Sequence, residues 1–156
     1  MTSVLSLGSN LGDRLGHLRA ALTLLGARFA VVATSPVYET RPVGVEDQSP
    51  FLNCVTLLAS DDSHAVLRAC HDAEEARGRL RSRRWGPRTL DVDVVSVDGL
   101  VSADPRLTLP HPRAHERAFV LVPWLDVDPD AVLPGRGPVR AVVHDLDTSG
   151  VRRWKP

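Results

Sequence analysis

One stretch of the chain, residues 89–95, combines β-branched and apolar residues with two aspartates at alternate positions. Gly86-Pro87 comes just before it and prevents a helix from continuing, because proline fixes φ and disfavours helical backbone in the preceding residue. Residues of a strand alternate between its faces, so Asp91 and Asp93 share one face, roughly 6–7 Å apart at Cα. The opposite face consists of Leu90, Val92 and Val94. The sequence therefore predicts a strand with one face in a core and two carboxylates on the other.

The segment before this strand is strongly basic. Two neighbouring carboxylates repel each other unless a cation lies between them, and Mg²⁺ is usually held by one or two carboxylates together with substrate phosphates. Arginine binds phosphate oxygens in pairs through its planar guanidinium. The succession of the two segments therefore favours a magnesium–polyphosphate site over a solvated basic loop beside a polar-faced edge strand. Residues 77–88 contain no acidic side chain and include Arg77, Arg79, Arg81, Arg83, Arg84 and Arg88.

Length and composition predict one globular domain over residues 1–156. The 19 basic and 19 acidic side chains cancel, so the whole molecule has no net attraction to nucleic acid or membrane, and we expect a monomer. No stretch approaches the about 20 apolar residues of a membrane span, and the first eight residues lack the basic start of a signal peptide. Cys54 and Cys70 have no metal-ligand spacing, so we expect buried free thiols in a reducing cytoplasm.

Hydrophobic periodicity predicts alternating strands and helices. We expect strands over residues 3–7, 29–40 and 51–59, and a fourth from Thr89. Between them, the first helix is capped by Asn10 and closes at Gly26, and the second is capped within 61–63. Their buried stripes are Leu15, Leu18, Leu22 and Leu25, and Val66, Cys70 and Ala73. Further helices over 114–121, ended near Pro123, and 139–146 complete an α+β fold. Its order is that of a ferredoxin-like βαββαβ sandwich with helices on one face of the sheet, and with additional C-terminal helices.

Five segments, in this order and spacing, resemble one known family. They are residues 7–13, 38–44, 51–53, 84–93 and 110–112, of which 84–93 is the most specific. The family is 6-hydroxymethyl-7,8-dihydropterin pyrophosphokinase of folate biosynthesis, and the resemblance covers essentially the whole chain. It implies that the terminal diphosphate of ATP passes intact to the hydroxymethyl oxygen of the pterin, with release of AMP.

The resemblance also implies roles for individual residues. Two Mg²⁺ ions would be ligated by Asp91 and Asp93, in agreement with the reasoning from the strand, while Arg81 and Arg88 would stabilise the transferring group. The implied ATP-binding residues are His71, Glu74, Arg79, Arg84, Arg88, His111 and Arg117. The implied pterin-binding residues are Thr40, Val43, Phe51, Asn53, Trp85 and Phe119. Aromatic faces suit a flat ring, and an asparagine amide offers it both a donor and an acceptor. Which aspartate takes the hydroxyl proton, if either does, is left open.

Other interpretations compete with this one. A ferredoxin-like single-stranded RNA binder would use the arginine segment, although such domains present aromatic residues where this chain has Asp91 and Asp93. Another magnesium-dependent transferase or a nuclease would use the same pair of aspartates. Single residues also admit structural roles, His111 as a histidine held between prolines and Glu74 as a surface carboxylate on its helix.

Overall fold

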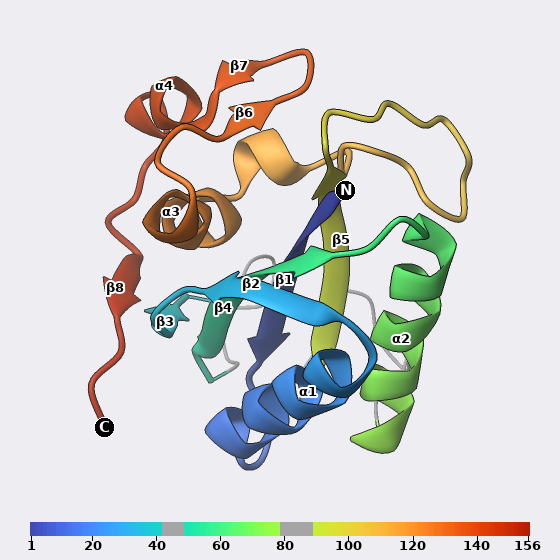
Figure 1. Cartoon of the computed structure of the whole chain (residues 1–156). Coiled ribbons are helices and arrows are strands. Elements are labelled where there is room, and N and C mark those ends of the chain that lie inside the picture. The colour runs from blue at the N-terminus through green and yellow to red at the C-terminus, as the bar shows by residue number, and fades with distance from the viewer. Residues whose placement is uncertain (42–48, 79–88) are drawn as a thin grey trace.

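The computed structural model describes residues 1–41, 49–78 and 89–156 (Figure 1). The first two thirds of the chain consist mainly of strands, interrupted by two long helices, and shorter elements follow. The strands are β1 (Thr2–Ser9), β2 (Ala30–Thr34), β3 (Tyr38–Thr40), β4 (Phe51–Ala59), β5 (Asp91–Val97), β6 (Val132–Leu133), β7 (Gly137–Pro138) and β8 (Val151–Arg153). The helices are α1 (Arg14–Arg28), α2 (Ser63–Ala76), the 3₁₀ helix η1 (Ala114–Glu116), α3 (Ala118–Val127) and α4 (Val139–His144).

A six-stranded sheet with the order β5-β1-β4-β3-β8 forms the centre, and β2 also pairs with β4. Each of these pairings is antiparallel. The prediction of one long strand over 29–40 is wrong, because β2 and β3 are separate and pair with different halves of β4. Pro36 lies between them and has no N–H to give to a ladder, so the strand is interrupted there. The prediction for residues 51–59 is confirmed by β4.

Helices cover both faces of the sheet, so the expectation that they lie on one face is wrong (Figure 1). One core lies between the sheet and the pair α1 and α2, and it includes the predicted stripe of α2. The second core joins the opposite face of the sheet to α3 and α4. This second layer forms because β1, β4 and β5 also carry apolar side chains on that face, which must be removed from water. These side chains are Val4, Val55, Leu57 and Val95.

The predicted ends of the first helix are also corrected. The N-cap is Asp13, whose Oδ1 accepts a hydrogen bond from the Gly16 N–H at 3.1 Å. Asn10 lies three residues before this cap, and its amide donates to the Ser49 carbonyl oxygen at 3.2 Å. The helix continues through Gly26 to Arg28, since one glycine near a helix end costs only about 1 kcal/mol.

The C-terminal third differs most from the prediction. The helix expected over 114–121 is η1 followed by α3, which runs past Pro123 to Val127. Pro123 removes one intrahelical hydrogen bond, but burial of Leu121 and Trp124 on the second core offsets that loss. The last predicted helix is shorter, and β8, which pairs with β3 at a sheet edge, was not predicted. Among the described residues, no helix has the length and apolar character needed to cross a bilayer.

Candidate active site

Asp91 and Asp93 open the edge strand β5 and are both partly exposed. Between and beside them, Leu90, Val92 and Val94 are buried in the core beneath α1 and α2. The alternation predicted from the sequence is therefore confirmed. The two carboxylates lie on the face of the sheet that α3 also covers, whereas α1 and α2 lie on the opposite face.

The side chain of Glu74 in α2 binds the backbone at the start of β5. Its side chain is buried, with 3% of the residue exposed, and its Oε2 accepts a hydrogen bond from the Val92 N–H at 3.0 Å. The interpretation of Glu74 as a surface carboxylate is therefore wrong. Because β5 is an edge strand, β1 cannot satisfy the N–H groups on its outer side, and a buried N–H without a partner would be costly.

His111 and Arg117 lie near the two aspartates. Arg117 Nη1 is 3.6 Å from Asp93 Oδ2. The backbone N–H of His111 donates to the Val95 carbonyl oxygen at 2.8 Å, which fixes the backbone of the histidine to β5. Burial, assisted by the positive charge of Arg117 and opposed by Asp91, lowers the pKa of His111 to about 4. Burial also lowers the pKa of Arg117 from its usual value, while Asp93 opposes that change.

The imidazole of His111 is neutral at pH 7 and has a defined tautomer. The Arg113 backbone N–H donates to His111 Nδ1 at 3.1 Å, which assigns the proton to Nε2. A neutral His111 thus offers one N–H donor in a place that already holds the guanidinium of Arg117 and two carboxylates. This concentration of groups with both signs of charge is typical of a catalytic site.

A second part of the site consists of the residues that lie beside Asp91 on the neighbouring strands of the sheet. Gly8 of β1 is opposite Asp91 on one side and Asn53 of β4 on the other. The Asn53 side chain lies so close over Gly8 that a Cβ there would be 2.7 Å from Asn53 Nδ2. Thr40 Oγ1 donates to Asn53 Oδ1 at 2.6 Å, and both side chains are buried. The site therefore includes a fixed amide beside the carboxylates.

Two partly buried aromatic side chains belong to this face. Phe51 is opposite Thr40 in the register. Its Cδ1 would be 3.5 Å from a Cβ placed on Gly8, so the ring lies beside that glycine. Phe119 of α3 lies beneath the guanidinium of Arg117, 5.6 Å from its Cζ to the ring centroid. Contacts therefore link Asp93 through Arg117 to Phe119, and neighbouring register positions link Asp91 through Gly8 to Asn53.

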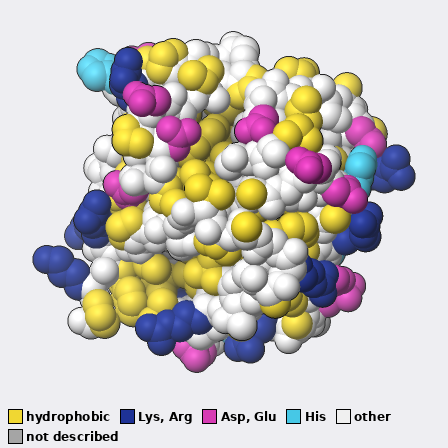
Figure 2. Space-filling view, viewed as in Figure 1, with side chains coloured by type: hydrophobic (Ala, Val, Ile, Leu, Met, Phe, Trp, Pro, Cys, Tyr) yellow, Lys and Arg dark blue, Asp and Glu magenta, His cyan; other side chains and the backbone are white. Residues whose placement is uncertain are grey.

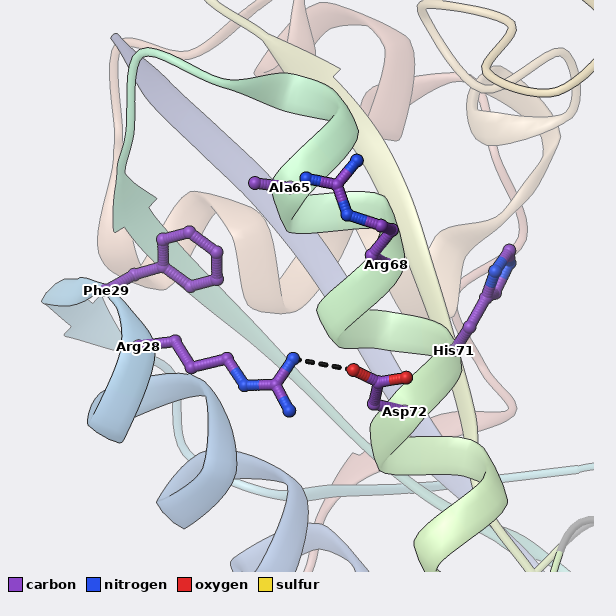
Figure 3. Close-up of a pocket in the computed structure, with 6 residues that line it drawn as sticks. All are labelled: Arg28, Phe29, Ala65, Arg68, His71 and Asp72. Atoms are coloured by element: carbon purple, nitrogen blue, oxygen red, sulfur yellow. Dashed lines mark hydrogen bonds and ion pairs between the residues drawn. The ribbon is translucent and has the colours of Figure 1, made fainter.

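His71 is placed differently from Glu74, His111 and Arg117. It is exposed on α2, and it points away from the ion pair of Arg28 and Asp72 (Figure 3). These three residues line a surface pocket of about 480 Å³ between α1 and α2, together with Phe29, Ala65 and Arg68. Six further predicted site residues lie outside the described part of the chain: Val43, Arg79, Arg81, Arg84, Trp85 and Arg88.

Sequence reasoning missed two residues of the site, Gly8 and Arg113. A glycine inside a strand often marks the close approach of another group, and this is the signal in the sequence that points to Gly8. Arg113 follows the histidine between two prolines, and only the folded chain shows that its backbone positions the imidazole.

The donor set fits a magnesium ion that completes its shell with phosphate and water. Within residues 1–41, 49–78 and 89–156, no three His, Cys, Asp or Glu side chains form a metal cage. Two adjacent carboxylates are nevertheless what Mg²⁺ takes from a protein when substrate phosphates supply further oxygens.

Charges of both signs are mixed on one face of the molecule. On the face shown in Figure 2, Lys and Arg side chains stand at separate places along the outline with acidic side chains among them. A long nucleic acid would instead need a continuous basic surface.

Fold and site together define an α+β protein in which two carboxylates, a histidine and an arginine meet at the start of an edge strand. The structure is similar to chains that combine HPPK and DHPS from Plasmodium falciparum, with a TM-score of 0.69 at 13% sequence identity. That match covers 92% of this chain and 45% of the other, so the chain spans less than half of the longer protein. At a sequence identity this low, the structural similarity establishes the fold alone.

Sequence comparison identifies the family. The family model for 7,8-dihydro-6-hydroxymethylpterin-pyrophosphokinase (HPPK) matches residues 4–129. The 2-amino-4-hydroxy-6-hydroxymethyldihydropteridine pyrophosphokinase of Mycobacterium tuberculosis is 46% identical over 98% of this chain and 89% of its own. The Bacillus subtilis protein of that name is 40% identical over 97% of this chain and 89% of its own. The chain belongs to the HPPK family.

Membership of this family defines the reaction. The protein is a diphosphokinase of folate biosynthesis that uses ATP and transfers a diphosphate to 6-hydroxymethyl-7,8-dihydropterin. The resemblance found in the sequence is thereby confirmed. The family favours diphosphate transfer over the RNA-binding and nuclease interpretations.

Proposed function

We propose that diphosphate transfer depends on Mg²⁺ and that two ions are held between Asp91 and Asp93 and the phosphates of ATP. The placement of both carboxylates on one partly exposed face of β5 carries this proposal. Bound there, the metal would neutralise phosphate charge and make the β-phosphorus more electrophilic. The pterin hydroxyl oxygen would then form a bond to that phosphorus and lose its proton to water or to one of the two carboxylates. The bond from the β-phosphorus to the oxygen that bridges it to the α-phosphorus would break, and AMP would leave with that oxygen.

The nucleotide end of the site is proposed to be His111 and Arg117. Arg117 lies 3.6 Å from Asp93, so its charge is already close to where the phosphates would lie. The neutral His111 would donate a hydrogen bond from its Nε2–H to a phosphate oxygen without adding a charge to the site. Contacts of ATP with His71 and Glu74 stay predictions, as do those with the arginines Arg79, Arg81, Arg84 and Arg88.

The pterin end is proposed to be Thr40, Phe51, Asn53 and Phe119, with Val43 and Trp85 as further predicted contacts. Thr40 donates to Asn53 Oδ1, which orients the amide so that Nδ2 can donate to a ring acceptor. Phe51 and Phe119 are both partly exposed and could cover a flat ring. The register places Asn53 and Asp91 on either side of Gly8, so pterin and phosphates would meet above that glycine.

The metal proposal is tested with charge-removing variants of constant size. We expect that Asp91→Asn and Asp93→Asn each lower the rate of AMP formation from magnesium ATP and the reduced pterin alcohol by about a hundredfold or more. Asp130→Asn, at an exposed position, is the matched control and should match the wild-type protein. Near-normal turnover of both site variants would show that the metal role is wrong.

The remaining proposals concern the molecule as a whole. The antiparallel order β5-β1-β4, with β2 and β3 on β4, supports a ferredoxin-like description of the part of the chain from β1 to β5. Both cysteines are free and buried, which supports the reducing cytoplasm as the location. A single domain over 1–156 and a monomer are proposed as well.

A further inference from the structure

The connection from β3 to β4 begins and ends at proposed pterin residues. Thr40 and Phe51 lie opposite each other in the register, and the chain between them leaves and rejoins the sheet at this point. Thr40 also holds the amide of Asn53. The relative position of the two ends of this connection therefore determines the shape of the pterin pocket.

One side chain joins these two ends. Arg14, the first residue of α1, donates from Nη1 to Glu39 Oε2 at 3.0 Å and to the Pro50 carbonyl oxygen at 2.9 Å. Glu39 belongs to β3, and Pro50 immediately precedes β4. The Asn10 amide adds a hydrogen bond to the Ser49 carbonyl oxygen at 3.2 Å. The turn from β1 into α1 thus contacts both ends of the connection.

Arg14 acts from the face of the sheet opposite the substrates. Glu39 alternates with Tyr38 and Thr40 along β3, so its side chain is on the α1 side while Thr40 is on the side of the site. The Arg14 side chain is partly buried, with 26% exposed, so water screens its ion pair less than it would on an open surface. Arg14 would not contact the pterin but would fix the backbone that does.

We propose that Arg14 is a positioning residue for pterin binding, a role that rests on the proposed pterin site. Its Nη1 carries two N–H groups, which suits a task that needs two acceptors in different directions, one a carboxylate and one a carbonyl oxygen. Losing it leaves Glu39 and the Pro50 carbonyl without this link, so the two ends of the connection separate more readily. The binding of ATP depends on β5, His111 and Arg117 and is not affected directly.

The test compares Arg14→Met with Arg19→Met. Arg19 is an exposed arginine of the same helix and serves as the control. In steady-state AMP formation, we expect Arg14→Met to raise the KM for the pterin about tenfold, the scale of a lost hydrogen bond to a charged group. Its KM for ATP and the pterin KM of Arg19→Met should stay at wild-type values. Amide hydrogen exchange at Thr40 and Phe51 should be faster in Arg14→Met alone.

A second variant divides the link into its two parts. Glu39→Gln keeps the size of the side chain and leaves the Pro50 contact in place, so its pterin KM should lie between those of the wild-type protein and Arg14→Met. If Arg14→Met does not fold, Arg14→Lys keeps the charge on a shorter side chain that lacks Nη1, and it should raise the pterin KM in the same way.

Two results would overturn the proposal. One is a pterin KM that is the same in Arg14→Met and Arg19→Met, and the other is an equal rise of both substrates' KM values, which would indicate general loosening. The pterin site itself is tested separately with Asn53→Ala. If that variant keeps a normal pterin KM while the wild-type protein forms AMP, the proposed site is wrong independently of Arg14.

Discussion

His111 links the electrostatics of the site to the stability of the protein at residue scale. Its folded pKa of about 4 lies below the ordinary value of 6.5 because the ring is largely buried and Arg117 is nearby. The folded state therefore favours the neutral ring, and the unfolded state binds the proton more tightly. The resulting stabilisation is fully present above pH 6.5 and is lost as the pH falls from 6.5 through about 4.

We predict that the unfolding free energy of the metal-free protein falls by roughly 1–3 kcal/mol between pH 6.5 and about 4 because His111 becomes protonated. The upper limit of this range allows for the partial exposure of the ring, which weakens the effect. Urea denaturation at a series of pH values measures it. His111→Gln should flatten this part of the profile, whereas His64→Gln, at an exposed helix position, should not. Parallel profiles for both variants would contradict the prediction.

At the scale of elements, the start of β5 depends on α2. Replacing Glu74 by leucine keeps the volume but leaves the buried Val92 N–H without its acceptor, which should cost about 1–3 kcal/mol of stability and lower kcat by disturbing Asp91 and Asp93. Glu74→Gln retains an acceptor oxygen and should lose less of both. Thermal unfolding and AMP formation measure the two effects, and the exposed neighbour variant Glu75→Leu should change neither. If Glu74→Leu behaves like Glu75→Leu, α2 does not hold the strand.

Local patterns predicted these elements well, and contacts between distant residues explain what they missed. The alternation around Asp91 depends on neighbouring residues only and was predicted correctly. His71 and Glu74 are three residues apart on one helix, yet one is exposed and the other buried, because β5 packs on only part of the helix surface. The strand β8 has only three residues, and two of them are arginines. A segment this short and polar has no local pattern that predicts a strand, so its pairing with β3 comes from tertiary structure.

The second layer of helices did leave a signal in the sequence. Residues 51–59 are almost continuously apolar, which is typical of a strand buried on both faces. Applied to β4, this pattern predicts cover on each side of the sheet, as α1 and α3 provide. The identity of Asn53 as the group that approaches Gly8 and the double contact of Arg14 had no such signal, because each joins segments that only the folded sheet brings together.

At the scale of the whole molecule, two cores share one sheet. Leu58 of β4 is fully buried in the core beneath α1 and α2, and Leu121 of α3 is fully buried in the other. If residues 1–156 form one cooperative domain, Leu58→Ala and Leu121→Ala should each cost about 2–5 kcal/mol and lower the midpoint of a single transition. Leu100→Ala, at a leucine that is 43% exposed, is the control and should change little.

Two probes decide whether the layers unfold together. Trp124 is buried in the second core, so in a background with Trp85 and Trp154 replaced by phenylalanine its emission reports that layer. Circular dichroism in the far ultraviolet reports all helices and strands. Because β4 contributes buried side chains to both cores, loss of either core exposes apolar surface of the same strand, and we expect coincident transitions in both leucine variants. A Trp124 transition in Leu121→Ala that precedes the loss of circular dichroism would mean that α3 and its core unfold as a separate unit.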